Sequence, residues 1–365
     1  MLKELLEEKD YLPILKMNDG SPVTRENWGA RRQEMLELLY EYSYGRSPEK
    51  AEFITGEISS AKYNEYAGKV IEENVNIRFR TSYGFGYVPF TLYTPKRFKN
   101  PPVLLHIAFR PAPDKYIPVE EITDRGYALA VVCYESIIND KHFGDFSGGL
   151  GRHFDMTIER EPNEWGKIGM WAYGASIVLD YLLTRDDLDG EHVSVMGHSR
   201  LGKTALWAGA LDERFFTVIS NDSGYGGAAS SKKGKGERVR DFIRGGSWDW
   251  YCERFKDYVD EKEDEKPYDQ SFLLALVAPR YLVVGSATED RGADPEAEFL
   301  TTLHASAAWE LLGKPGLICP DEMPEPDKAF HDGSVGYHLR TGKHFLSRED
   351  WNYYMDFIDK KIGRK

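Results

Sequence analysis

Ser199 stands in a pattern that could turn a serine hydroxyl into a nucleophile. A short apolar run at residues 192–196 precedes it, and a stretch rich in Ala and Leu without Pro follows at residues 204–211. Strand, tight turn and helix in this order are typical of a nucleophile elbow, in which the turn lifts the hydroxyl clear of the sheet. The second glycine, Gly202, stands one residue later than in the common G-x-S-x-G spacing. The alternative is a turn serine that only caps a helix.

A serine nucleophile needs a base to take its proton and a carboxylate to hold that base. In sites of this kind the chain order is serine, acid, histidine. His344 follows Ser199 and lies in a loop just ahead of a helix signal at residues 347–351, so we expect it to be the base. Three other histidines also follow the serine: His304 in an expected helix, His338 in an expected strand, and His331 beside Asp332 as the weaker rival.

Two aspartates compete for the role of the acid. Asp290 follows the expected strand at 279–285, and Asp222 follows the expected strand at 218–220. Either could instead be a helix cap or a loop residue, because Asp is common in turns. We predict that Asp290 is the main partner of His344, with Asp222 as a second carboxylate near the same imidazole. Glu289 and Asp294 are weaker candidates in an expected exposed loop.

The elements that position these residues are predicted from the pattern of apolar residues. Continuous apolar runs at 103–109 and 128–133 are expected of strands buried on both faces. Alternating apolar residues at 75–79 and 88–92 indicate antiparallel strands at a sheet edge. Helical patterns lie between the later strands, as at 164–183. This alternation predicts an α/β fold with a doubly wound, mostly parallel sheet.

The chain of 365 residues is long enough for one large α/β domain with additions. Residues 1–50 are expected to form a helical extension packed on the main domain, because apolar residues repeat at helical spacing between residues 26 and 44. Residues 51–365 are expected to form the catalytic domain.

Composition excludes several classes of partner. The net charge of −13 and the pI of about 5.3 argue against a nucleic-acid backbone and against an anionic membrane surface. The three cysteines show no paired metal spacing, and no metal site or disulfide framework is expected. The N-terminus lacks the basic start and apolar run of a secretory peptide, so we expect a cytoplasmic protein as the chain is given, or a secreted one if it is a trimmed form. The oligomeric state is left open.

The run G-H-S-R-L-G-K-T-A-L-W-A-G-A-L-D-E-R-F, which starts at Gly197, resembles the serine region of the glucuronoyl esterases, carbohydrate esterase family fifteen. It is also similar to bacterial relatives described as acetyl xylan esterases. The resemblance covers most of the chain from about Trp28 on and continues in the expected order through residues 165–174, 221–227, 267–270, 278–280 and 342–344. It implies an α/β-hydrolase fold.

The resemblance also implies roles for single residues. Arg200 matches the arginine that stabilises the oxyanion with its side chain and amide, which suits a guanidinium because it cannot deprotonate. Lys203 matches a lysine that contacts sugar hydroxyls, and His344 matches the base. Family members place the acid at the position of Asp222 or at that of Asp290, and this chain has a carboxylate at both.

One departure concerns the sugar site. Members that act on glucuronoyl esters carry a tryptophan two residues after the later acid, whereas this chain has Gly292 there. Trp248 or Trp250 could substitute, and we take Trp250 as the candidate for substrate binding.

These features together predict a serine carboxylic-ester hydrolase that acts on carbohydrate esters of the plant cell wall, similar to the glucuronoyl esterases. No metal or organic cofactor is implied. An acetyl xylan esterase, which removes acetyl groups from xylan, is the alternative within the same class. A catalytically silent carbohydrate-binding relative is a further alternative, and the complete Ser, Arg, Lys, Asp and His set argues against it.

Overall fold

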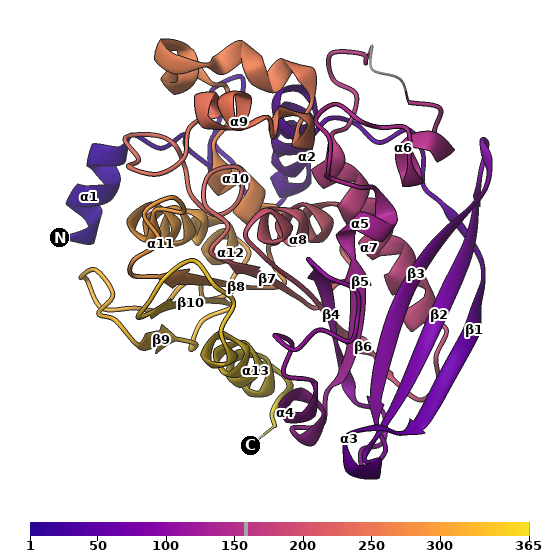
Figure 1. Cartoon of the computed structure of the whole chain (residues 1–365). Helices are drawn as coiled ribbons and strands as arrows, with labels where there is room; N and C mark the ends of the chain where they lie inside the picture. The colour runs from indigo at the N-terminus through magenta and orange to yellow at the C-terminus, as the bar shows by residue number, and fades with distance from the viewer. Residues whose placement is uncertain (157–159, 365) are drawn as a thin grey trace.

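The computed structural model describes residues 1–156 and 160–364. Its centre is one sheet of ten strands in the order β1-β2-β3-β5-β4-β6-β7-β8-β10-β9 (Figure 1). The six neighbours from β5 to β10 run parallel, whereas β1, β2 and β3 add antiparallel strands at one edge and β9 adds one at the other. The strands are β1 (Glu52–Asn64), β2 (Val70–Thr81), β3 (Gly84–Pro95), β4 (Pro102–Ala108), β5 (Ala128–Cys133), β6 (Asp189–His198), β7 (Thr217–Asn221), β8 (Tyr281–Ala287), β9 (Lys328–Phe330) and β10 (Val335–Arg340).

The predicted fold class is confirmed by this topology. The antiparallel edge predicted from alternating apolar residues is β2 and β3, joined by β1. The continuous apolar runs became β4 and β5, and every residue of both strands is buried. Successive side chains of a strand point to opposite faces, so a strand covered by helices on both sides needs apolar residues throughout.

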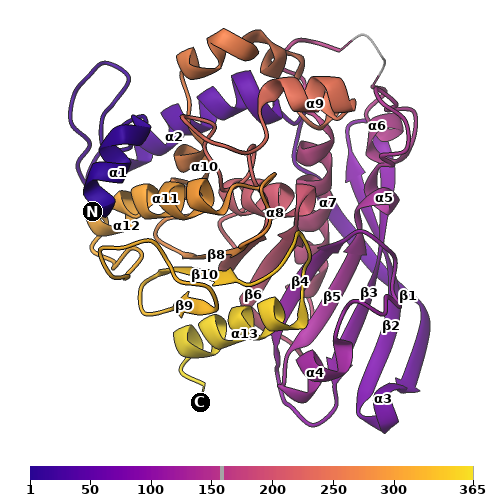
Figure 2. The same cartoon turned by 60° about the vertical axis from the view of Figure 1, so that its left-hand side comes forward.

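Helices cover both faces of the sheet (Figures 1 and 2). The α-helices are α1 (Leu2–Lys9), α2 (Trp28–Leu39), α3 (Glu65–Gly68), α4 (Val119–Asp124), α5 (Tyr134–Ile137), α6 (Gly149–His153), α7 (Lys167–Leu182), α8 (Arg200–Leu211), α9 (Val239–Gly245), α10 (Gln270–Ala275), α11 (Pro295–Ala305), α12 (Ala307–Leu311) and α13 (Arg348–Ile362). A π-helical turn, η1 (Tyr40–Tyr44), extends α2, and three 3₁₀ segments are η2 (Trp248–Trp250), η3 (Glu253–Tyr258) and η4 (Asp260–Glu265).

Two apolar clusters divide along the faces of the sheet. On β4, Val103 and Leu105 belong to the larger cluster, which includes α7 and α8. Leu104 and Ala108 of the same strand belong to the smaller cluster, which includes α4 and α13. The last helix, α13, begins at a reciprocal cap: Asp350 N donates to Ser347 Oγ at 3.2 Å and Ser347 N donates to Asp350 Oδ2 at 2.8 Å.

The N-terminal helices share the larger cluster. Trp28, Met35 and Leu39 of α2 are buried in it, together with Tyr44. The Tyr44 ring stacks on Trp207 of α8 with 4.4 Å between ring centroids, and its hydroxyl donates to Gly226 O at 2.9 Å. Residues 1–50 therefore lie directly on the sheet domain, while a domain boundary at residue 50 stays a prediction.

The helix expected around His304 is interrupted. The structure has two helices, α11 and α12, that meet at Ser306. The Ser306 hydroxyl donates to Thr302 O at 3.2 Å and accepts from Leu317 N at 2.8 Å, so it holds the loop between α12 and β9 at the break. Within the described ranges, no helix is long and apolar enough to cross a membrane.

Candidate active site

Ser199 occupies a strained turn between β6, which ends at His198, and α8, which begins at Arg200. Its backbone has φ 58° and ψ −129°, a conformation that costs a residue with a side chain roughly 1–3 kcal/mol. Ser199 N donates to Asn221 O at 2.8 Å, and Ser199 O accepts from Gly202 N at 2.8 Å. The Ser199 side chain makes no capping hydrogen bond to α8. The alternative of a helix-capping serine is therefore wrong for this turn.

Gly197 allows the turn to close. A Cβ atom at this position would lie 2.0 Å from Leu201 O, closer than any side-chain carbon can approach. The first turn of α8 thus packs directly on the end of β6, which leaves the amides at the start of α8 next to Ser199. Amides in this position can donate to an oxyanion that forms on a substrate of the serine.

His344 and Asp290 meet because their loops follow adjacent parallel strands. β8 and β10 pair through Ala287 and Arg340, and the two side chains lie just past this pair on the same edge of the sheet. His344 Nδ1 donates to Asp290 Oδ2 at 2.5 Å. Burial alone would raise the pKa of the Asp290 carboxyl, but the hydrogen bond and charge of His344 lower it below its usual value. Asp290 is therefore an ionised partner for the ring.

The loop that carries His344 is tied to its neighbour by main-chain groups. Glu289 N donates to Gly342 O at 2.7 Å. The Arg340 guanidinium donates to Lys343 O at 3.0 Å and to Phe345 O at 2.7 Å. Arg340 thus holds the carbonyls on both sides of His344, which fixes the ring without blocking it: the His344 side chain is 45% exposed.

Asp222 lies near the same ring, but its carboxyl differs from that of Asp290 in protonation. One atom each of Asp222, Asp290 and His344 lie within 4.8 Å of one another. Asp222 is buried, and its Oδ1 has no hydrogen-bond partner among residues 1–156 and 160–364. Burial, with the negative charge of Glu298 next, raises the pKa of the Asp222 carboxyl well above its usual value. The structure brings both predicted carboxylates to His344, and it is Asp290 that bonds the ring.

These three side chains are also spaced closely enough to share a metal ion. A cation on the imidazole would compete with the short His344–Asp290 hydrogen bond, and the buried Asp222 carboxyl favours its neutral form, which binds cations poorly. The donor set therefore suits proton transfer better than metal binding.

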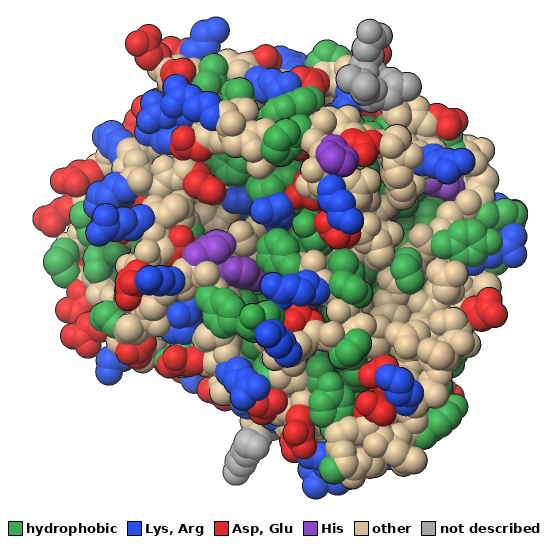
Figure 3. All heavy atoms as spheres, in the orientation of Figure 1, with side chains coloured by type: hydrophobic (Ala, Val, Ile, Leu, Met, Phe, Trp, Pro, Cys, Tyr) green, Lys and Arg blue, Asp and Glu red, His purple; other side chains and the backbone are tan. Residues whose placement is uncertain are grey.

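His198, which sequence patterns did not single out, packs against His344. Histidine side chains meet near the middle of the face in Figure 3, and the ring centroids of His198 and His344 are 4.5 Å apart. Burial, with the charge of His344 next, lowers the pKa of His198 to about 4. A neutral His198 ring does not repel His344 when that ring gains a proton.

Arg200 lies beside Trp250 at the start of α8. The guanidinium carbon is 4.3 Å from the centroid of the Trp250 ring, and Nη1 donates to Asp140 Oδ2 at 2.6 Å. The Arg200 side chain is 32% exposed, whereas Trp250 is only 8% exposed. One face of the indole carries the guanidinium, so a contact between Trp250 and a sugar stays a prediction.

Lys203 is directed into the protein. Its ammonium donates to Ser223 O at 2.6 Å and to Tyr225 O at 2.7 Å, and it lies 3.4 Å from Glu237 Oε2. These contacts shape the loop after β7. The predicted contact of Lys203 with sugar hydroxyls stays a prediction, because the ammonium is buried and occupied in this structure.

Glu298 of α11 is a buried carboxylate that sequence reasoning missed. Its Oε1 accepts from Ser223 N at 2.8 Å and Gly224 N at 2.9 Å, and its Oε2 accepts from Ser286 Oγ at 2.6 Å. Burial raises the pKa of Glu298 to about 7 despite these donors. No sequence pattern indicates that Glu298, inside α11, accepts hydrogen bonds from the loop after β7. The same holds for Asp140, a loop residue that binds Arg200.

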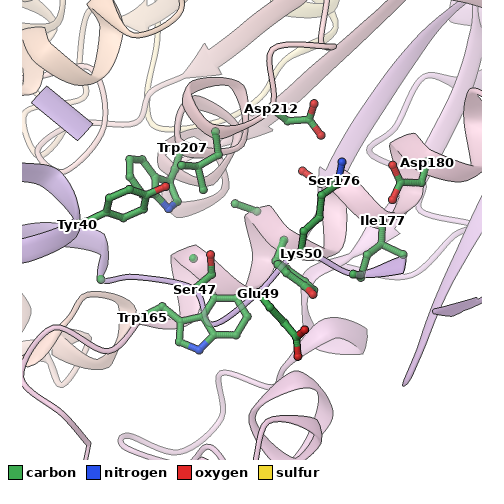
Figure 4. Close-up of a pocket in the computed structure, with 16 residues that line it drawn as sticks. Tyr40, Ser47, Glu49, Lys50, Trp165, Ser176, Ile177, Asp180, Trp207 and Asp212 are labelled. Carbon is green, nitrogen blue, oxygen red and sulfur yellow. The ribbon is translucent and has the colours of Figure 1, made fainter. Parts of the chain in front are cut away.

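A cavity of about 260 Å³ lies elsewhere, between residues 40–51 and helices α7 and α8 (Figure 4). Trp207 lines it and stands eight residues after Ser199, which is about 12 Å along a helix. Asp180 and Asp212 also line it, and both pair with Arg214, at 2.6 Å and 2.7 Å. This cavity is separate from the group around Ser199 and His344.

The chain is similar to a known protein family and to several of its members. Residues 118–313 match the family model described as glucuronyl esterase, fungi. The chain is 36% identical to carbohydrate esterase MZ0003 of an unknown prokaryotic organism, over 94% of this chain and 88% of that protein. It is 30% identical to the 4-O-methyl-glucuronoyl methylesterase of Schizophyllum commune, over 82% of this chain and 72% of that protein.

Two solved structures are similar over nearly the whole chain. A glucuronoyl esterase from Solibacter usitatus has a TM-score of 0.86 and 34% identity, and the match covers 96% of this chain and 97% of that one. A promiscuous CE15 esterase from a marine bacterial metagenome has a TM-score of 0.83 and 35% identity, covering 97% of this chain and 98% of that one.

The buried Glu298 makes a prediction about stability and pH. Its folded-state pKa of about 7 lies above the 4.5 of a free Glu, so between these values the folded protein binds the proton and the unfolded chain does not. This group therefore lowers the free energy of unfolding as pH rises from about 5 to about 7, by on the order of 3 kcal/mol.

In Glu298→Gln this part of the pH dependence should vanish, as measured by urea unfolding at several pH values. Glu57→Gln, at an exposed position of β1, is the matched control and should keep the wild-type dependence. An unchanged pH slope in Glu298→Gln would show that Glu298 ionises normally.

Proposed function

The chain belongs to the glucuronoyl esterases, carbohydrate esterase family fifteen, and from that premise we propose that it hydrolyses glucuronoyl esters with Ser199 as nucleophile. It is a carboxylic ester hydrolase that acts on carbohydrate esters of the plant cell wall. The observation that supports the serine mechanism best is the Ser199 turn, with φ 58° and ψ −129°, together with a hydrogen-bonded pair on the same sheet. This pair is His344, in the loop after β10, and Asp290, in the loop after β8. A strained serine at a strand end and a carboxylate-held imidazole are the two parts that acyl transfer requires.

The first half of the reaction forms an acyl-enzyme. Ser199 Oγ attacks the ester carbonyl carbon as His344 accepts the hydroxyl proton, and the carbonyl oxygen becomes an oxyanion. Arg200 and the amides at the start of α8 stabilise that charge. The bond to the alcohol then breaks, and His344 gives its proton to the departing oxygen. Asp290 stabilises the imidazolium throughout through the Nδ1 hydrogen bond.

The second half of the reaction regenerates the free enzyme. A water molecule attacks the acyl carbon while His344 takes a proton from it, and Ser199 leaves as the hydroxyl when the tetrahedral intermediate collapses. The products are the free carboxylic acid and the alcohol. The neutral His198 ring beside His344 adds no like charge at either protonated stage.

Two observations bear on the acyl group of the ester. Relatives are named 4-O-methyl-glucuronoyl methylesterases, which places the sugar on the acyl side of their ester. This chain has Gly292 at the position of the stacking tryptophan, and Trp250 exposes only 8% of its surface. Acetyl removal from xylan, in which the acyl group is small, is therefore the second candidate.

A side-by-side assay separates the two substrates. We expect kcat/KM on benzyl glucuronate to exceed that on acetylated xylan by at least about tenfold, which is a difference of roughly 1.4 kcal/mol in transition-state binding. The reverse order would identify an acetyl xylan esterase. No hydrolysis of either ester by the folded protein would indicate the silent relative.

Ser199→Ala should lose ester hydrolysis while the fold is kept. Removal of the hydroxyl eliminates covalent catalysis and leaves at most the ~10³–10⁴-fold assistance over water that oxyanion donors and binding supply. Turnover of benzyl glucuronate and the thermal unfolding midpoint measure the two properties. Ser59→Ala, at an exposed position of β1, is the control and should hydrolyse normally. Near-normal turnover in folded Ser199→Ala would exclude the serine mechanism.

The two carboxylates make a prediction about coupling. Asp290→Asn should lower kcat/KM more than Asp222→Asn, because Asp290 bonds His344 Nδ1. Each single loss should stay mild, within about tenfold, since the other carboxylate can still orient the ring. The double variant should approach the ~10⁴-fold loss of a triad without an acid.

A double-mutant cycle measures this coupling from the four kcat/KM values. A double variant that loses only the product of the two single factors would show that the carboxylates act independently. Full loss in Asp222→Asn with Asp290→Asn unaffected would reverse the assignment.

A further inference from the structure

Asp140 holds two groups of the oxyanion side of the site, one with each carboxylate oxygen. Arg200 Nη1 donates to Asp140 Oδ2 at 2.6 Å, and Trp250 Nε1 donates to Asp140 Oδ1 at 2.9 Å. The guanidinium carbon of Arg200 is 4.3 Å from the Trp250 ring centroid, so the two groups bound by Asp140 also stack on each other. Phe109 lies next to the guanidinium at 5.6 Å. Asp140, Arg200 and Trp250 therefore each contact the other two.

The guanidinium is held while most of its donors stay free. Nη1 is the one nitrogen of Arg200 with a hydrogen-bond partner in the described part of the chain, and Nε is buried without one. A guanidinium has five N–H donors in a rigid plane. Fixing it by one nitrogen and by stacking therefore sets its orientation and keeps other donors available for a substrate oxygen.

Lys167, the first residue of α7, is the second cation that faces Asp140. Its fully buried ammonium lies 3.5 Å from Asp140 Oδ1 and 2.7 Å from Asp249 Oδ2. Asp249 Oδ2 also accepts from Gly144 N at 2.9 Å. The loop that carries Asp140 is thus bound to the segment that carries Trp250 by charges and by a hydrogen bond from a main-chain amide to a carboxylate.

Lys167 is shared between two carboxylates. It lies 2.7 Å from Asp249 and 3.5 Å from Asp140, whereas Arg200 lies 2.6 Å from Asp140. Two cations therefore face two carboxylates, and Arg200 is the nearer cationic partner of Asp140.

We propose that Asp140 is a positioning residue for ester hydrolysis, which holds Arg200 and Trp250 in the orientation in which the guanidinium stabilises the oxyanion. Asp140 acts through Arg200 and does not itself touch the ester. Oxyanion stabilisation is effective when the donors are already in place before the charge forms, because no reorganisation is then needed in the transition state. A long, partly exposed arginine without Asp140 would sample several rotamers. This inference rests on the proposed role of Arg200 as an oxyanion donor.

The test compares wild type, Asp140→Asn, Arg200→Ala and the double variant on benzyl glucuronate. Asp140→Asn should lower kcat roughly 10- to 100-fold and change KM less than about threefold, because the orientation matters mainly in the transition state. Arg200→Ala should lower kcat about 10²–10³-fold, as expected for an oxyanion donor. The double variant should match Arg200→Ala within about threefold, since Asp140 has nothing left to position.

Two kinetic results would overturn the proposal. One is an Asp140→Asn enzyme with a kcat within about twofold of wild type. The other is a double variant that loses the product of the two single factors, which would show that Asp140 acts independently of Arg200. An Arg200→Ala enzyme with unchanged kcat would instead show that the oxyanion role of Arg200 is wrong, and Ser199→Ala tests the serine mechanism separately.

A destabilised Asp140→Asn protein would not end the test. Trp250→Phe removes one donor to Asp140 and keeps an aromatic face beneath Arg200. Its smaller loss in kcat should disappear in the Arg200→Ala background, and a loss that persists there would contradict the proposal. Asp212→Asn, a carboxylate paired with Arg214 beside the separate cavity, is the control and should keep wild-type kcat and KM.

Discussion

The left-handed backbone of Ser199 is the constraint on which the site depends. A residue with a side chain enters this region only when its surroundings hold it there. Here β6 and β7 hold it through the Ser199 N to Asn221 O hydrogen bond, and α8 holds it through the contact of Leu201 with Gly197. Asn221 ends β7 and Asp222 follows it, so the same hydrogen bond that maintains the elbow also sets the start of the loop that brings Asp222 to His344.

The charges around His344 leave Asp290 as the ionised carboxylate that bonds its ring. Asp222, Glu298 and Asp350 are all buried, the charges of Glu298 and Asp350 act on Asp222, and so many carboxylates cannot all be ionised in a small volume. Burial opposes the ionisation of Asp350, but His338, at 2.9 Å, and Arg340 lower the pKa of its carboxyl. Arg340 also binds the carbonyls of the His344 loop. The same guanidinium thus balances negative charge and places the base.

The oxyanion side of the site is built from a different part of the chain. The Arg200 guanidinium packs against Trp250. The segments around Trp250 are hydrogen-bonded to the N-terminal region: Cys252 N donates to Ser43 O at 2.8 Å, and Gly166 N donates to Tyr44 O at 3.0 Å. A Cβ on Gly166 would lie 2.2 Å from Trp250 O, so these segments touch at the main chain. The packing of residues 1–50 on the sheet domain therefore reaches the site through the segment behind Arg200.

The sequence by itself determined the sheet and the Ser199 turn. Both are local: apolar runs of six or seven residues gave β4 and β5, and strand, glycine, serine and helix lie within about 20 residues around Ser199. The order of serine, acid and histidine left four histidines, of which His344 was chosen because it lies in a loop just ahead of a helix. Asp290 and Asp222 were chosen as acids because each follows an expected strand. The tertiary structure decided which aspartate bonds the ring, because that depends on the pairing of β8 with β10 across 54 residues and on the burial of Asp222 among other carboxylates. It alone also placed Asp140, 60 residues from Arg200 in the chain, against that arginine. No pattern in a sequence reports such contacts, since a hydrogen bond across the fold leaves no periodicity and desolvation is a property of everything packed around a group.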